Sequence, residues 1–399
     1  MPIASLALDK YILSESGACA LAFDPMAWAK PQYSRTKIDL AGEMLLLGVQ
    51  AGLEFASFME AVENREDAIE VINNWRAVHS YPLQTIKMTL KRRAKHIDRN
   101  AVIAQRLKRL ASIKLKLKVS LESGNHPKLS QMQDIGGCRA VMENVSQVRR
   151  LQQAFQEASE KNPHRGPQFS KIYDYIATPK ASGYRSVHLV YRFRSSSPMH
   201  RCYNGQRIEI QLRSRRQHSW ATAVETYSTF SGEALKSNIG SDDWKRFFAL
   251  VSSAIAIEEK SPCVPDTPHT LKGLRPELKN LYVRLNVYNV LSGYTAATKY
   301  TKESPDEVMK NADAYLLTLD PEQFSISVTP YKREQLTVAN VRYAQLEKEQ
   351  PKLQVVLVSA DSLAGLRIAY PNYFLDTTEF IKIVQRAIGV EPNENKSAV

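Results

Sequence analysis

The chain has 399 residues, of which 43% are hydrophobic and 24% are charged. This composition is typical of a globular protein and excludes a mainly disordered, collagen-like or small disulfide-rich chain. No run approaches the roughly 18 apolar residues of a membrane span, and the first residues do not read as a secretion signal. We therefore expect a cytoplasmic protein with no membrane partner. The chain has four cysteines, Cys19, Cys138, Cys202 and Cys263. They form no CxxC pair, so the sequence does not indicate a zinc ribbon.

The net charge of +13 belongs to the first part of the chain. Residues 261–399 contain sixteen basic and sixteen acidic residues, so residues 1–260 carry the whole excess. Within them, residues 87–118 hold twelve Lys and Arg residues against one acid, Asp98. This density favours binding to phosphates or nucleic acid, and a solvated helical face is the alternative explanation.

The elements predicted before residue 130 are helical. Residues 35–80 have apolar side chains at helical spacing, which predicts an N-terminal helical section. The same spacing continues through the basic segment, so its charges are expected opposite one apolar stripe. The residues of this stripe are Ile103, Leu107, Leu110 and Ile113.

Strands and helices are predicted to alternate in the middle of the chain. A turn with a short strand is predicted over residues 136–142 and a helix over residues 145–155. Apolar and polar residues alternate over 187–194 and 207–213, which predicts two strands. Because side chains alternate along a strand, the second strand presents on one face Arg207, Glu209, Gln211 and Arg213.

Three prolines between residues 262 and 268 predict a linker. Beyond it, residues 324–328 and 353–358 are predicted strands, and residues 336–346 and 376–387 are predicted helices. We therefore expect an α/β (α+β) fold with a mixed sheet. The expected divisions are an N-terminal helical extension (1–84), a basic mixed-sheet domain (85–260), a linker with connecting helices (261–320) and a small C-terminal α/β domain (321–399).

Two isolated carboxylates in basic surroundings are the candidate catalytic residues. Asp134 comes just before a Gly-Gly turn, and Glu209 lies between arginines on one strand face. If the fold brings them together, they can hold a Mg²⁺ ion that bridges nucleotide phosphates. For the strand alone, a partly exposed antiparallel sheet is the alternative explanation.

A turn-rich loop over residues 179–183 lies between the two acids and is suited to approach phosphates. Lys180 and Arg185 are its candidate charge partners. Tyr184 is a candidate for stacking on a nucleic-acid base. His188 is a general acid or base, a phosphate contact or a structural residue.

Four ordered motifs resemble the synthetase domain of RelA/SpoT-type enzymes, which move the β,γ-pyrophosphate of ATP onto a ribose 3′-hydroxyl. The motifs are RLKRLASIKLKLK (106–118), QDIGGCR (133–139), YIATPKASGYRSVH (175–188) and EIQLRSRRQHSWA (209–221). The resemblance implies a nucleotidyltransferase-like synthetase domain over about residues 85–260. It also implies ATP as donor and Mg²⁺ as cofactor.

The resemblance assigns roles to single residues. Asp134 matches the Mg²⁺ ligand, and Glu209 matches the second acid, which assists the metal or activates the acceptor hydroxyl. The residues that match the ATP-binding set are Arg106, Lys108, Ser112, Lys116 and Arg139. The residues expected around the acceptor are Lys180, Tyr184, Arg185, His188, Gln211 and Arg213.

The layout beyond the linker, with Tyr370 and Tyr373 in a YxxY motif, resembles the fused toxin–antitoxin group called CapRel. In that group the toxic synthetase pyrophosphorylates the 3′-CCA end of tRNA and blocks translation. A C-terminal pseudo-zinc-finger occludes the ATP site until a phage protein, typically capsid, binds. One alternative is an alarmone synthetase that makes (p)ppGpp from GDP or GTP. Another is a non-enzymatic RNA-binding module with a decayed site.

Overall fold

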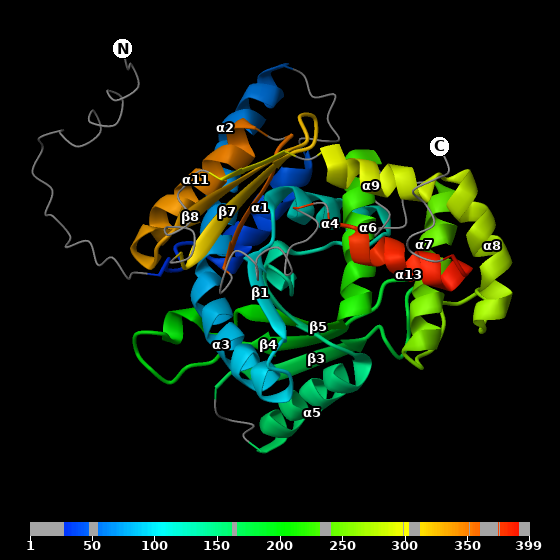
Figure 1. Cartoon of the computed structure of the whole chain (residues 1–399). Helices are drawn as coiled ribbons and strands as arrows, with labels where there is room; N and C mark the ends of the chain where they lie inside the picture. The colour runs from blue at the N-terminus through cyan, green and yellow to red at the C-terminus, as the bar shows by residue number, and fades with distance from the viewer. Residues whose placement is uncertain are drawn as a thin grey trace, which may run out of the picture.

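The computed structural model describes residues 28–47, 55–161, 166–231, 241–297, 299–302, 312–350, 352–359, 374 and 376–390 (Figure 1). Nine strands in these ranges form one sheet. In sheet order they are β3 (Gln168–Asp174), β4 (Val187–Arg192), β5 (Arg207–Ser214), β2 (Gly136–Met142), β1 (Val102–Leu107), β9 (Gln354–Ser359), β7 (Ala314–Asp320), β8 (Ser325–Tyr331) and β6 (Lys299–Lys302). The pairs β2–β5 and β6–β8 are parallel and the others antiparallel, which confirms the predicted mixed sheet. None of the helices described is long and apolar enough to cross a membrane.

The burial pattern of β5 defines the two faces of this sheet. Its apolar side chains Ile208, Ile210 and Leu212 are fully buried on one face. The helices α3 (Ser80–Ile97) and α5 (Val145–Lys161) cover that face, and α5 lies below the strands in Figure 1. Because side chains alternate along a strand, the polar residues of β5 point to the opposite face.

Helices precede the sheet, as the sequence predicted for residues 35–80. They are α1 (Arg35–Leu47) and α2 (Phe55–Val78). Both pack with α4 (Leu110–Glu122) in an apolar cluster that buries Ile72 and Ile113 completely. The N-terminal helices therefore support α4, the helix of the first family-like motif.

The continuous helix predicted through the basic segment is wrong in its middle, between α3 and α4. Val102–Leu107 form strand β1, and α4 begins only at Leu110. The apolar residues Ile103 and Leu107 are four apart, a spacing that fits both a strand and a helix, and pairing with β2 decides for the strand. The basic residues are consequently divided, since those of α3 lie on the side of the sheet opposite to the polar face of β5.

The C-terminal strands carry one covering helix, α11 (Leu336–Glu349), as predicted. Its residues Tyr343 and Leu346 pack on the sheet. Strand β7 lies in residues that were expected to belong to the linker with connecting helices. It pairs with β8 along its whole length, so the boundary expected at residue 320 falls within a hairpin. Phe324 lies in the turn before β8, with a positive φ of 48°, and not in the strand.

A helical layer flanks the sheet. It consists of α6 (Arg215–Ser231), α7 (Asp242–Glu258), α8 (Leu271–Arg284), α9 (Val287–Ala297) and α13 (Thr378–Ile388), and the short 3₁₀ helices elsewhere are η1 (Leu129–Gln131), η2 (Arg201–Tyr203) and η4 (Arg333–Gln335). The proline-containing segment connects α7 to α8. The predicted C-terminal helix exists, but it buries Phe380 among α6, α7 and α8 and does not cover the C-terminal strands. Figure 1 shows it crossing these helices.

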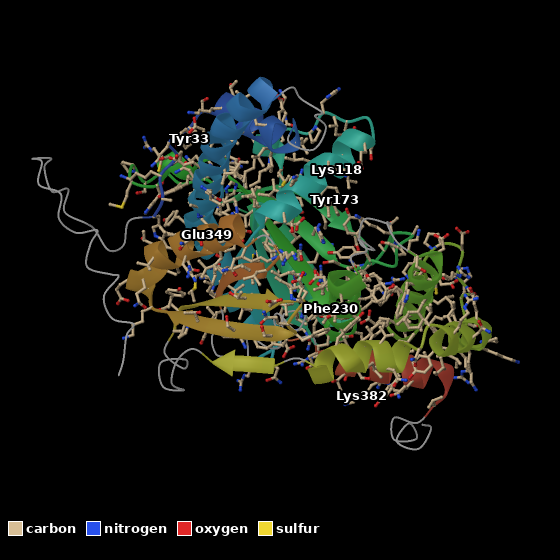
Figure 2. The ribbon with its side chains drawn as sticks, turned by 90° about the horizontal axis from the view of Figure 1, so that it is seen from above. Tyr33, Lys118, Tyr173, Phe230, Glu349 and Lys382 are labelled. Atoms are coloured by element: carbon tan, nitrogen blue, oxygen red, sulfur yellow. The ribbon has the colours of Figure 1, made fainter. Side chains whose placement is uncertain are left out.

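Phe230, at the end of α6, joins the helical layer to the C-terminal strands. Its ring stacks on Tyr294 at 4.4 Å and on Phe324 at 5.0 Å between centroids. Figure 2 shows Phe230 where the helices meet these strands. The three rings come from α6, α9 and the β7–β8 turn, so the two parts are packed together.

Candidate active site

Asp134 lies just before β2, between two lysines of the first family-like motif. Lys108 Nζ donates to Asp134 Oδ2 and Lys116 Nζ donates to Asp134 Oδ1, each at 2.8 Å. Burial alone would raise the pKa of Asp134, but the two ammonium groups hold that pKa well below its ordinary value. Asp134 is therefore ionised at neutral pH and lies beside two cations.

Glu209 is the second acid and is only 8% exposed. His188 of β4 lies 2.8 Å from Glu209 Oε1 through Nδ1, and Gln211 Nε2 donates to Glu209 Oε2 at 2.6 Å. Burial opposes charge on His188, but Tyr184 and Glu209 outweigh it and raise the pKa of His188 to about 9. His188 in turn keeps the pKa of Glu209 low despite its burial. At neutral pH the pair is therefore a carboxylate beside an imidazolium.

The two acids line the same pocket, as the predicted magnesium site required. Its walls come from β1, β2, β5 and the segment before β2: Ala104, Gln105, Arg106, Lys108, Asp134, Gly137, Cys138, Arg139, Glu209 and Gln211. Gly137 lies opposite Glu209 in the parallel β2–β5 pairing. The fold therefore brings together two carboxylates that are 75 positions apart.

The donor set fits a Mg²⁺ ion. Magnesium is commonly held by one or two carboxylates, with substrate phosphates and water completing its octahedron. No cluster of three or more His, Cys, Asp or Glu residues that could hold a metal exists in the described ranges, and the carboxylates that line this pocket are those of Asp134 and Glu209. Such a site requires a nucleotide to complete it.

The predicted ATP-binding residues are largely brought together. Arg106, Lys108 and Arg139 line the pocket, and Lys116 reaches Asp134 from α4. Ser112 lies in the first turn of α4 and is not part of the pocket lining. The pocket thus combines two carboxylates with a surplus of positive charge, as a polyphosphate site needs.

Four of the six predicted acceptor residues form a closed ring of hydrogen bonds with Glu209. Tyr184 Oη lies 2.7 Å from His188 Nε2 and accepts from Arg213 at 2.6 Å. Arg213 also donates to Gln211 Oε1 at 3.2 Å, and Gln211 completes the ring at Glu209. Every member therefore restrains its neighbours.

Lys180 lies beside this ring. Its Nζ is 4.6 Å from the ring centroid of Tyr175 and 5.8 Å from that of Tyr184. Tyr184 is half-buried and supported by edge-to-face contacts with Tyr175 and His188. These contacts fix the Tyr184 ring next to a cation.

Arg185 is the one predicted acceptor residue that points elsewhere. It is 2% exposed and donates to Ser252 Oγ at 2.9 Å and to the Pro262 carbonyl at 2.6 Å. Burial lowers its pKa to about 10. Gly183, two residues earlier, has φ +88°, and Ser252 also donates to the Gly183 carbonyl. Arg185 therefore anchors the loop to α7, and its assignment to the acceptor site is wrong.

The C-terminal part contacts the first family-like motif (residues 106–118) through residues that sequence reasoning did not name. Val358 of β9 pairs with Arg106 of β1, extending the sheet across the motif. Gln354 accepts from Arg109 Nη1 at 3.1 Å. These partners are some 250 positions apart, and no local pattern signals such a contact.

Glu347 of α11 makes the most buried of these contacts. Its Oε1 accepts from the Leu110 amide at 3.1 Å, at the first turn of α4, and its Oε2 accepts from Arg76 at 2.7 Å. Arg76 is 3% exposed and also donates to Tyr343 Oη at 2.6 Å. Glu347 thereby links α2, α4 and α11. The predicted autoinhibitory residues Tyr370 and Tyr373 lie outside the described residues.

Comparison with known proteins finds similarity in the part of the chain that contains this site. Residues 105–231 match the region found in RelA / SpoT proteins. A search of curated proteins found no match. Among solved structures, the small alarmone synthetase 1 from Bacillus subtilis bound to its product pppGpp is 21% identical, with 46% of this chain and 90% of that chain covered and a TM-score of 0.37.

Two further structures give similar values. The small alarmone synthetase 2 from Bacillus subtilis is 20% identical, with coverage of 47% and 93% and a TM-score of 0.36. A GTP pyrophosphokinase family protein from Streptococcus pneumoniae is 21% identical, with coverage of 45% and 85% and a TM-score of 0.35. The matched residues 105–231 contain Asp134, Glu209 and the hydrogen-bonded ring around them, so the similarity to the RelA / SpoT region covers the candidate site.

Proposed function

We propose that the chain transfers the β,γ-pyrophosphate of ATP to a ribose 3′-hydroxyl. The observation that carries this proposal is that Asp134 and Glu209 line one pocket together with Arg106, Lys108 and Arg139. Two ionised carboxylates among three cations suit a magnesium–nucleotide complex. The family match over residues 105–231 supports the same reaction class.

In the proposed reaction, the 3′-oxygen of the acceptor attacks the β-phosphorus of ATP in line. The bond from that phosphorus to the α,β-bridging oxygen breaks, and AMP leaves with the electron pair. Arg106, Lys108 and Arg139 hold the phosphates and neutralise charge as it develops. Glu209 takes the hydroxyl proton, and His188 fixes the orientation of its carboxylate. A Mg²⁺ ion held by Asp134 and Glu209 would supply additional charge neutralisation.

For the acceptor, we propose the 3′-CCA end of tRNA, with GDP or GTP as the second candidate. The half-buried Tyr184 ring beside Lys180 suits stacking of a base in either case. The charge excess of residues 1–260 favours a long polyanion. Only part of that charge borders the pocket, because α3 lies behind the sheet, so its cations do not contact an acceptor bound at Tyr184.

We further propose that the C-terminal part restrains the synthetase until a partner displaces it. Two contacts support such autoinhibition: the pairing of β9 with β1 and the hydrogen bond from the Leu110 amide to Glu347. Both are made at the first family-like motif, residues 106–118. In the resembling group the displacing partner is a phage protein such as capsid, and we propose the same anti-phage toxin–antitoxin role for this chain. A trigger must bind the displaced state more tightly than the docked state.

The reaction is tested with purified protein and ATP labelled in its β- and γ-phosphates. Deacylated tRNA and GDP are offered separately, and the mass of each acceptor is measured. A gain of pyrophosphate on tRNA supports the proposal, and label on GDP alone would exclude the tRNA acceptor. Failure to consume ATP with any acceptor, and with the phage capsid protein added, would favour a binding module.

The assigned acids are tested by Asp134→Asn and Glu209→Gln. We expect each to lower transfer by at least about a hundredfold, because each removes a charge from the reacting site. Glu157→Gln, an exposed carboxylate on α5, is the matched control. Near-native turnover in either site variant, with an unchanged circular dichroism spectrum, would overturn the catalytic roles of these two acids.

A further inference from the structure

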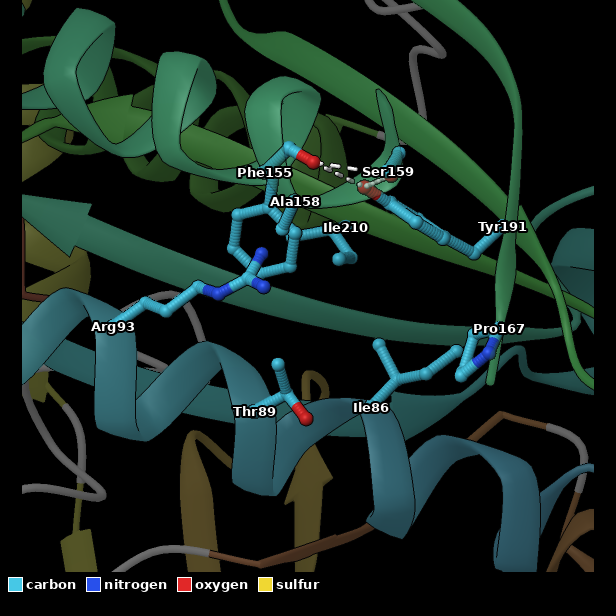
Figure 3. Close-up of a pocket in the computed structure, with 9 residues that line it drawn as sticks. All are labelled: Ile86, Thr89, Arg93, Phe155, Ala158, Ser159, Pro167, Tyr191 and Ile210. Carbon is cyan, nitrogen blue, oxygen red and sulfur yellow. Dashed lines mark hydrogen bonds between the residues drawn. The ribbon is translucent and has the colours of Figure 1, made fainter. Parts of the chain in front are cut away.

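A cavity of about 220 Å³ lies between α3, α5 and the apolar face of the sheet (Figure 3). Ile210 forms part of its wall, so the cavity is on the side of β5 opposite to the candidate active site. A dry protein cavity of about 150 Å³ holds benzene. This cavity therefore has room for one ring with a small substituent, and is too small for a nucleotide.

The walls of the cavity are mostly apolar. Ile86 and Phe155 are each 3% exposed, and Ile210 is completely buried. Tyr191 contributes its ring, and its hydroxyl is already engaged with Ser159 Oγ at 3.2 Å and with the Phe155 carbonyl at 3.3 Å. Such an apolar lining accommodates a hydrophobic ring but provides no strong hydrogen-bond acceptor.

One charged group enters this lining. Figure 3 shows the side chain of Arg93 extending from α3 to the ring of Phe155, and its guanidinium carbon lies 4.4 Å from the centroid of that ring. No carboxylate within the described ranges forms an ion pair with Arg93. Partial burial lowers its pKa, and the adjacent Arg92 acts in the same direction. The cavity therefore holds one positive charge without a counter-charge.

A guanidinium that stacks on a ring keeps its N–H groups in the plane of the stack, where they are available to a carboxylate or phosphate. We propose that this cavity is a binding site for a small ligand with one apolar ring and one anionic group. The ring occupies the space beside Ile86 and Tyr191, and the anion pairs with Arg93. Neutral ligands of the same shape leave the guanidinium uncompensated and bind more weakly.

The site has a consequence that rests on the proposed function. Ile210 lies between Glu209 and Gln211 in β5, so a bound ligand contacts the reverse side of the strand that holds the second acid. Binding of a ligand in the cavity therefore changes how firmly β5 is held in place. Binding itself is independent of the reaction, so it is measured without ATP, and failure of the one proposal is distinguishable from failure of the other.

The test uses benzoate as the probe and the full chain, with binding followed by calorimetry or ligand-observed NMR. A nine-atom ligand in a suitable pocket is expected to bind with a Kd of about 1 mM. Benzyl alcohol, which has a similar shape and no charge, is expected to bind at least about tenfold more weakly.

Two variants test the geometry. Arg93→Met keeps an apolar stem on Phe155 and removes the charge, and it is expected to weaken benzoate binding about tenfold or more. Ala158→Met fills the cavity and is expected to abolish binding. Arg92→Met, which removes an exposed charge from the same helix, is the matched control and should leave binding unchanged. Absence of saturable benzoate binding, equal binding of benzyl alcohol, or full binding by folded Ala158→Met would each overturn the proposal.

Discussion

Replacing Glu347 by Gln removes one negative charge from the contact between α11 and the start of α4, and we expect this to loosen the C-terminal part. In the native chain both carboxylate oxygens are used, one by Arg76 and one by the Leu110 amide. A glutamine side chain has only one oxygen. Its NH₂ group must therefore face either the Arg76 guanidinium or the Leu110 amide, and both of these groups are hydrogen-bond donors.

The size of the effect follows from burial. Arg76 is 3% exposed, and the Glu347 side chain is 10% exposed. Removing one partner of a buried ion pair costs about 3–5 kcal/mol. Arg76 keeps its bonds to Tyr343 and Asn73, so the lower end applies, at about 3 kcal/mol. If these elements open locally, this corresponds to roughly a hundredfold faster exchange.

The assay is amide hydrogen exchange, read by mass spectrometry on peptides that contain the first turn of α4 and strand β9. Glu349→Gln is the control, because Glu349 is exposed on the same helix and, among the described residues, accepts from its helix neighbour Gln345. Its position at the end of α11 is labelled in Figure 2. Unchanged protection in Glu347→Gln, or equal loss in Glu349→Gln, would refute the reasoning. Under the proposed control, Glu347→Gln also raises basal transfer activity.

Three further predictions concern other parts of the molecule. Because its folded pKa of about 9 exceeds the ordinary 6.5, His188 contributes stability that is complete below about pH 6.5 and is lost as pH rises towards 9, so the Tm of the native chain should fall over this range more than that of His188→Gln. Phe380→Ala should cost about 3–5 kcal/mol of unfolding free energy, measured by denaturant titration, whereas Val341→Ala, at a position 64% exposed, should change it little. Replacing both Tyr370 and Tyr373 by Ala should make expression toxic without a trigger, and harmless expression of a catalytically intact double variant would contradict autoinhibition.

Much of the catalytic part could be predicted because its signals are local. The alternation over residues 207–213 determines both the strand β5 and the face that carries Glu209. Strand β1 could not be distinguished from a helix, because Ile103 and Leu107 fit both periods and only pairing with β2 decides. Arg185 was assigned wrongly because a motif gives the order of residues but not the side on which each lies. Tyr184 enters the hydrogen-bonded ring, whereas the next residue, Arg185, bonds to Ser252 of α7.

The contacts of the C-terminal part could not be predicted for a different reason. Glu347 and Leu110 are 237 positions apart. In the sequence alone, Glu347 reads as an acid on a helix surface and Leu110 as the start of a helix, so neither signals the contact. The helix α13 has a strongly apolar face, and that pattern is equally compatible with covering a sheet or entering a helical layer. Only the complete fold shows which partner it has.

The pairing of β1 with β9 has a consequence for any form of the protein in which the C-terminal part is displaced. With β9 withdrawn, the β1 backbone beside Arg106 would present unpaired N–H and C=O groups to solvent. Bare strand edges recruit other extended chains, including copies of the same protein. Under the proposed control, the β1 edge must therefore be covered by a strand from the displacing partner, or the displaced form will self-associate.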